Sequence, residues 1–116
     1  MKIYISGPIT GKDPEEARRA FETAETEIRA KGHEPVNPYK LQCILAPETT
    51  TWEQYMRVAL ALLRECEAIC MLPGWGNSQG ARIENGQSYM DGRIIFDSVK
   101  EIRQEKPPEQ EAANGE

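Results

Sequence analysis

The chain has 116 residues, of which 39% are hydrophobic and 28% are charged, as is typical of one small globular domain. Its formal net charge of −5 comes from 14 basic and 19 acidic residues. This balance argues against a nucleic-acid duplex as partner, because phosphate neutralisation requires a basic surface. No apolar run is long enough to span a membrane and no signal peptide is evident, so we predict a cytoplasmic protein.

The first half of the chain predicts a strand, a helix and an extended segment. Residues 2–6 form a short apolar run closed by a Gly-Pro pair, which indicates a strand. A helix is expected from an N-cap at Asp13 to a stop at Gly32, with proline at its first position and apolar residues three to four apart. Prolines make residues 33–38 extended, and residues 39–50 are expected to be a loop.

The second half repeats this alternation. Thr50 and Glu53 have the spacing of a capping box, which predicts the start of a second helix. Residues 68–72 form an apolar strand that ends in a Pro-Gly turn, and Ser78 is expected to cap a third helix. Residues 93–96 predict a fourth strand, followed by one short helix.

Strands that alternate with helices predict an α/β fold. We expect a small doubly wound, flavodoxin- or Rossmann-like domain over residues 1–104, with a parallel sheet of about four to five strands and helices on both faces. Residues 105–116 are rich in Glu and Pro and predict a disordered acidic tail. Such folds bind ligands beyond the carboxyl ends of their strands. In this chain those ends are Ser6-Gly7-Pro8, Asn37-Pro38 and residues 72–75.

The third predicted helix carries the strongest candidate site. Ser78 offers a hydroxyl, and the first N–H groups of the helix offer an anion site. Glu84 lies six residues further on, and Gly80 and Ala81 precede it by one turn. Helical side chains lean toward the N-terminus, so the carboxylate would reach back over these two small residues. This geometry suits a nucleotide; the alternative is a capped surface helix with Glu84 in solvent.

The loop after the first strand is a second candidate. Gly7 and Gly11 would allow a ligand close to the backbone, although the loop is neither a Walker A motif nor a dinucleotide fingerprint. A plain turn is the alternative interpretation. Tyr4, on the preceding strand, is equally compatible with core packing.

Five further side chains are of types that can contact a ligand or a metal. Trp52 and Trp75 both offer a surface for stacking on a base, and Trp75 is the better candidate because it lies in the predicted crevice loop. His33 is the only imidazole, and we expect it on the surface. Cys66 and Cys70 lack the spacing of zinc ligands, so we expect them to be reduced core residues and predict no metal.

Two motifs together resemble the nucleoside 2-deoxyribosyltransferase-like family, particularly its short bacterial and phage members. The motifs are Ile3-Tyr4-Ile5-Ser6-Gly7-Pro8-Ile9-Thr10-Gly11 and Leu72-Pro73-Gly74-Trp75 followed by Ser78-x-Gly80-Ala81-x-x-Glu84. The resemblance covers about residues 1–97, and the pair of motifs is more specific than either alone.

The resemblance implies hydrolysis or deoxyribosyl transfer at the N-glycosidic bond of nucleosides or their 5′-monophosphates, without a cofactor. Glu84 would be the nucleophile that attacks the anomeric carbon, Tyr4 would position it, and Ser78 would hold the 5′-phosphate or hydroxyl. The substrate-binding residues would be Ser6, Gly7, Pro8, Ile9, Gly11, Asn37, Trp75, Ser78, Gly80 and Ala81. Members of the family form dimers or larger oligomers that complete each other's sites, so a homo-oligomer is implied.

This chain departs from the family before the third strand. It has Ala59 and Glu67 where relatives carry aspartates. The first of those aspartates contacts sugar hydroxyls or helps to protonate the departing base, a contribution typically worth ~10²–10⁴ in rate. Ala59 is equally compatible with simple packing on the buried face of its helix. A nucleotide-binding protein that sequesters or senses its ligand without catalysis, and a structural oligomer with a vestigial pocket, therefore remain alternatives.

Overall fold

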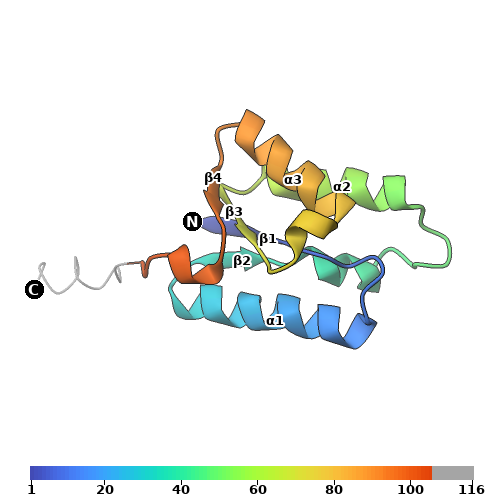
Figure 1. The fold of residues 1–116 in the computed structure, drawn as a ribbon, viewed down its shortest axis with the longest axis horizontal. Coiled ribbons are helices and arrows are strands. Elements are labelled where there is room, and N and C mark those ends of the chain that lie inside the picture. Colours follow the sequence, from blue (N-terminus) through green and yellow to red (C-terminus); the bar gives the residue numbers. More distant parts are fainter. Residues whose placement is uncertain (106–116) are drawn as a thin grey trace, which may run out of the picture.

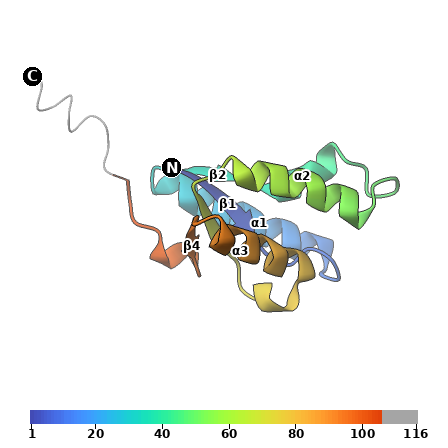
Figure 2. The same ribbon diagram turned by 90° about the horizontal axis from the view of Figure 1, so that it is seen from above.

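The computed structural model describes residues 1–105 and contains a four-stranded parallel sheet in the order β2-β1-β3-β4, with helices on both faces (Figures 1 and 2). The predicted doubly wound α/β fold is confirmed. With η marking 3-10 helices, the elements are β1 (Lys2–Ser6), α1 (Pro14–Ala30), β2 (Glu34–Val36), η1 (Pro38–Cys43), α2 (Trp52–Arg64), β3 (Ala68–Met71), η2 (Trp75–Asn77), α3 (Gln79–Met90), β4 (Ile94–Phe96) and η3 (Val99–Glu101).

The chain reverses its winding direction at β1. It leaves β1 for β2 through α1, which covers one face of the sheet, and then crosses to β3 through α2 on the other face (Figure 1). The helix α3 lies beside α2 on that second face (Figure 2). The carboxyl ends of β1 and β3 are adjacent, with Ser6 paired to Met71. This is the switch point at which a doubly wound fold forms its ligand crevice.

The side chains of β1 alternate between two cores. Ile3 and Ile5 pack with Phe21 in the layer formed by α1. Tyr4 packs in the second layer, with residues of α2, β3 and α3. Because side chains of a strand alternate between faces, Ser6 points to the same side as Tyr4. Two hydroxyl-bearing side chains of β1 therefore face α3.

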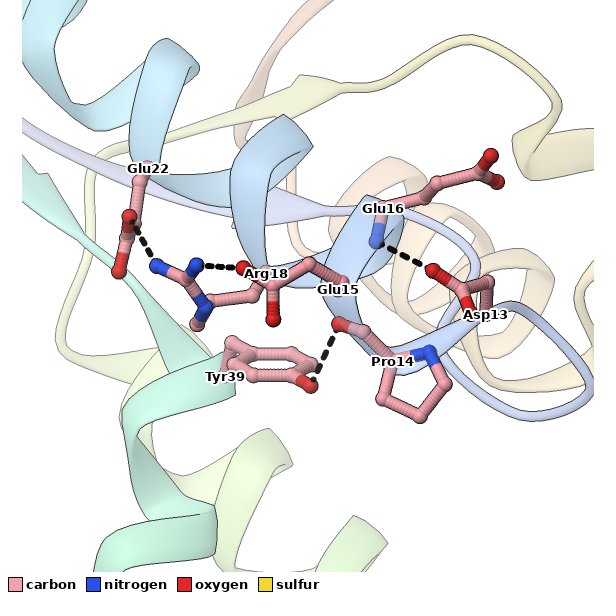
Figure 3. A network of polar contacts seen from close by, with 7 residues as sticks. All are labelled: Asp13, Pro14, Glu15, Glu16, Arg18, Glu22 and Tyr39. Carbon is pink, nitrogen blue, oxygen red and sulfur yellow. Dashed lines mark hydrogen bonds and ion pairs between the residues drawn. The ribbon is translucent and has the colours of Figure 1, made fainter.

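Polar contacts fix the start of α1 and the neighbouring turn (Figure 3). The side chain of Asp13 accepts a hydrogen bond from the N–H of Glu16, so the predicted N-cap is confirmed. Arg18 pairs with two glutamates of the same helix. The hydroxyl of Tyr39, in η1, donates to the carbonyl oxygen of Pro14 at 3.1 Å, which joins η1 to the start of α1.

The segment predicted as a loop, residues 39–50, is partly helical. A 3-10 helix, η1, begins at Pro38, and the side chain of Asn37 caps it by accepting from the N–H of Tyr39. The prediction of a plain loop was wrong because an Asn-Pro pair can start a helical turn as readily as it ends a strand.

The capping box of α2 lies one residue later than predicted. The residues that exchange the two hydrogen bonds are Thr51 and Gln54, not Thr50 and Glu53. Both pairs satisfy the same sequence pattern, so only the backbone conformation selects between them. The cap of α3 at Ser78 is confirmed.

His33 is buried, against the prediction that it lies on the surface. Its Nε2 is 2.7 Å from the carbonyl oxygen of Arg103, because the segment after η3 returns to the amino end of β2. Glu105 continues this contact by donating its N–H to the carbonyl of Lys31 at 2.8 Å. The remainder of the predicted disordered tail, residues 106–116, lies outside the described residues.

Cys66 and Cys70 are buried as predicted, and their thiols are free. Burial raises the pKa of Cys66 to about 11 and that of Cys70 to about 12, so both thiols stay protonated at neutral pH. Across residues 1–105, no cluster of His, Cys, Asp and Glu has three members placed to hold a metal ion. The same residues contain no helix with the length and hydrophobicity needed to cross a membrane.

The turns after β1 and β3 approach each other closely at Gly7. A Cβ atom on Gly7 would lie 2.8 Å from the Cβ of Leu72, whereas one on Gly86 in α3 would have no atom within 4 Å. We predict that Gly7→Ala lowers the free energy of unfolding by about 1–3 kcal/mol through overpacking. The matched Gly86→Ala should raise it by ~0.5–1 kcal/mol, because alanine favours a helix. Urea denaturation measures both; a Gly7→Ala variant as stable as the wild type would contradict this packing.

Candidate functional site

Glu84 is buried between α3 and β1, with only 6% of its surface exposed. The hydroxyl of Tyr4 donates to its Oε2 at 2.7 Å, and the hydroxyl of Ser6 donates to its Oε1 at 2.6 Å. Both donors lie on the face of β1 that is turned toward α3. The alternative in which Glu84 is a solvated surface residue is therefore excluded.

The surroundings of Glu84 hold its carboxylate in one orientation. Burial raises the pKa of Glu84, and the hydrogen bonds from Ser6 and Tyr4 oppose part of this increase. Burial, followed by the nearby charge of Glu84, raises the pKa of Tyr4 well above its usual value, so Tyr4 remains a donor at neutral pH. Among the described residues each carboxylate oxygen accepts one hydrogen bond. Each oxygen keeps a lone pair for a ligand or a reacting atom.

A cavity of about 600 Å³ opens beside Glu84 at the carboxyl ends of the strands. This volume lies within the usual range of small-molecule sites. The cavity is lined by Ile5, Gly7, Ile9, Thr10, Phe21, Pro38, Gln42, Leu45, Pro47, Thr50, Thr51, Trp52, Tyr55, Met56, Asn77, Ser78, Gln79, Gly80, Ala81 and Glu84. Glu84 is the only Asp, Glu, Lys, Arg or His side chain among these residues.

The first turn of α3 forms one wall of the cavity. The hydroxyl of Ser78 accepts a hydrogen bond from the N–H of Ala81 at 3.2 Å. The N–H groups of Gln79 and Gly80 lie in the first turn of α3 and so have no acceptor within the helix. Gly80 also packs against α2, since a Cβ on it would lie 3.2 Å from the sulfur of Met56. The small residues before Glu84 thus form the expected shelf and also let the two helices approach.

The structure brings half of the proposed ligand-contacting residues to the cavity. Gly7, Ile9, Ser78, Gly80 and Ala81 line it. Ser6 and Tyr4 contact Glu84 from behind and do not line the cavity. Pro8, Gly11, Asn37 and Trp75 are also absent from the lining residues.

Two of these outlying residues have structural contacts that account for their position. The side chain of Asn37 donates to Oε1 of Glu25 at 3.0 Å and caps η1. Trp75 packs against the core formed under α2 and α3. The sequence correctly predicted that Asn37 and Trp75 follow strand ends. The direction of each side chain, however, depends on the residues that it packs against.

The helix α2 contributes Tyr55 and Met56, which the sequence did not single out, and Trp52, which it gave as the weaker of two stacking candidates. Trp52, Tyr55 and Met56 line the cavity from α2, and Met56 lies next to the first turn of α3. The hydroxyl of Tyr55 donates to the carbonyl oxygen of Pro38 at 3.2 Å, which joins this wall to η1. The apolar spacing of α2 indicates its inner face but not which part of that face extends beyond the sheet.

The two positions that depart from the resembling family have structural roles here. Ala59 is fully buried on the inner face of α2. Glu67 lies before β3, at the amino ends of the strands, and its Oε1 accepts from the N–H of Lys2 at 3.0 Å. It is therefore at the opposite edge of the sheet from the cavity.

The hydrogen bonds from Tyr4 and Ser6 predict how the pKa of Glu84 changes when either hydroxyl is removed. A hydrogen bond to a charged group is worth about 1.5–3 kcal/mol. Tyr4→Phe and Ser6→Ala should therefore each raise the pKa of Glu84, by roughly one to two units. Carbon-13 NMR titration of labelled glutamate side chains measures this value. Tyr89→Phe, at an exposed tyrosine, is the control and should leave it unchanged; an unchanged pKa in both test variants would contradict the assigned contacts.

Comparison with known proteins places the chain in a family and relates its fold to one enzyme. The solved structure of a 2-desoxiribosyltransferase from Leishmania mexicana is similar with a TM-score of 0.56 and 20% identity, over 81% of this chain and 61% of that chain. At this identity the similarity shows the fold alone, and this chain spans about three-fifths of the length of that protein. No curated protein sequence matches. A family model described as "Domain of unknown function (DUF4406)" matches residues 1–95, so the chain belongs to the DUF4406 family.

Proposed function

We propose that this protein cleaves the N-glycosidic bond of nucleosides or their 5′-monophosphates through Glu84. The observation that carries the proposal is the buried carboxylate, held by two hydroxyls at the wall of a cavity of about 600 Å³. The 2-deoxyribosyltransferase name of the structural neighbour supports the same chemistry, as does the resemblance of both motifs to that family.

The reaction proceeds in two displacements at C1′ of the sugar. One oxygen of Glu84 forms a bond to C1′ while the bond from C1′ to the base nitrogen breaks, and the electron pair leaves with the base. The base takes a proton from solvent. Water then attacks C1′ and gives up a proton, and the carboxylate leaves, which releases the sugar and restores Glu84. A second base in place of water completes a deoxyribosyl transfer.

Tyr4 and Ser6 prepare Glu84 for this attack. Together they bind both carboxylate oxygens, so the side chain loses little freedom when it meets C1′. The raised pKa of Glu84 makes its carboxylate a better nucleophile than an exposed one once it is ionised. Ser78 lies one and a half turns of α3 before Glu84 and binds the 5′ end of the sugar.

A second function, ligand binding without turnover, is favoured by one specific observation. Glu84 is the only side chain with a carboxyl group among the residues that line the cavity, and Ala59 is buried. The described residues therefore supply no second carboxylic acid to protonate a departing base. In this alternative the protein sequesters or senses a nucleotide.

Glu84→Ala separates the two functions. Wild-type protein incubated with deoxynucleosides and their monophosphates should release free base, measured by liquid chromatography, and Glu84→Ala should reduce release to background. Glu67→Gln, at the opposite edge of the sheet, is the control and should retain activity. Saturable binding by the wild type without any release of base would instead support the binding protein.

Ser78→Ala tests the end of the cavity that holds the 5′ group. No Lys, Arg or His side chain is among the lining residues, so a phosphate would depend on the Ser78 hydroxyl and the helix N–H groups. We predict that Ser78→Ala weakens binding of monophosphates more than that of nucleosides, by calorimetry. Asp13→Ala removes the corresponding cap of α1 and controls for the ~1 kcal/mol of stability that a cap contributes. Equal losses for both ligands would exclude the phosphate role.

A further inference from the structure

We propose that the indole ring of Trp52 is the surface on which the nucleobase stacks, and that it gives the site a preference for large, planar bases. This inference rests on the proposed function, because it assigns an orientation to a nucleoside within the same cavity. Base stacking on an aromatic ring needs a flat, accessible face and no specific hydrogen bond.

The cavity has two chemically different walls. Asn77 at the end of η2, Ser78 at the N-cap of α3 and Gln79 supply polar groups, whereas Trp52 and Met56 of α2 supply large apolar surfaces. A nucleoside has the same division, since its sugar carries hydroxyl groups and its base has two flat faces. The sugar therefore lies along α3 and the base lies against α2.

Trp52 is the most exposed of the aromatic residues that line the cavity. Phe21 is fully buried and packs against Tyr39, with ring centroids 5.8 Å apart. Tyr55 is half-buried and its hydroxyl is engaged with Pro38. Trp52 is 36% exposed, and so it keeps ring surface for a ligand.

The positions of α2 and α3 place Trp52 within reach of a base whose sugar contacts Glu84. Both helices return from the carboxyl edge of the sheet, so they run parallel. Met56 lies against Gly80, which is one turn before Glu84, and Trp52 is one turn before Met56. Trp52 and Glu84 are thus separated by two turns, roughly 11 Å along the axes, a distance that a nucleoside spans when its sugar contacts Glu84 and its base contacts Trp52.

The start of α2 holds Trp52 in place before a ligand arrives. Trp52 is the first residue of the helix, and it directly follows Thr51, which exchanges two hydrogen bonds with Gln54. A surface that is already ordered loses little entropy on binding. The backbone of Trp52 therefore belongs to a capped helix rather than to a loop.

The two tryptophans of the chain allow a direct test by fluorescence. In a Glu84→Ala background, which prevents turnover, Trp75→Phe leaves Trp52 as the only reporter and Trp52→Phe leaves Trp75. Deoxyadenosine should quench the fluorescence of Trp52 saturably in the Trp75→Phe variant. It should leave the fluorescence of Trp75 unchanged in the Trp52→Phe variant. Calorimetry should show that Trp52→Ala weakens deoxyadenosine binding by roughly 5- to 100-fold, and deoxycytidine binding by less, whereas Trp75→Ala changes neither by more than about twofold.

The outcomes distinguish this inference from the proposed function. Nucleoside binding with quenching of Trp75 alone, or with equal affinity in Trp52→Ala and wild type, would overturn the stacking role and leave the function of Glu84 intact. The quenching comparison uses the conservative Trp52→Phe, so it holds even where Trp52→Ala fails to fold. Absence of both binding and base release in the wild type would overturn the proposed function, and this inference with it.

Discussion

The candidate site depends on the pair of hydrogen bonds that join Glu84 of α3 to the hydroxyls of Tyr4 and Ser6 on β1. A carboxylate that loses contact with water is costly unless other groups bind it. The two hydroxyls reduce this cost because they lie on one face of one strand. They also fix the register of α3 over the sheet, since a shift of one residue would turn Glu84 away from both donors.

The doubly wound topology supplies the space next to this carboxylate. The chain reverses direction between β1 and β3, so the turns after these strands diverge to opposite faces. Gly7 lets the turn after β1 pass close to Leu72, while α2 and α3 both begin at the same edge. Glu84 is held by a helix and a strand rather than by a loop, and such sites keep their geometry more accurately.

The composition of the cavity limits the chemistry that is possible there. One carboxylate faces a set of hydroxyl, amide, aromatic and aliphatic groups, so the residues that line the cavity provide one carboxylate and no cationic side chain. The lining residues include no second carboxylic acid that could protonate a leaving group. This arrangement is compatible with the proposed displacement at a sugar carbon, which needs one buried carboxylate as nucleophile.

The sequence by itself determined the elements whose signals are local: β1, the capped helix α1, β3, and α3 with Ser78 at its cap. It also indicated the edge of the sheet at which the cavity opens, and the family resemblance paired Tyr4 with Glu84. Only the tertiary structure decided that Ser6 binds Glu84, that His33 is buried, and that Trp52 lines the cavity while Trp75 packs against the core. Helical and strand periodicity reflects contacts within a few residues, whereas these outcomes depend on segments that meet only after the whole sheet has formed.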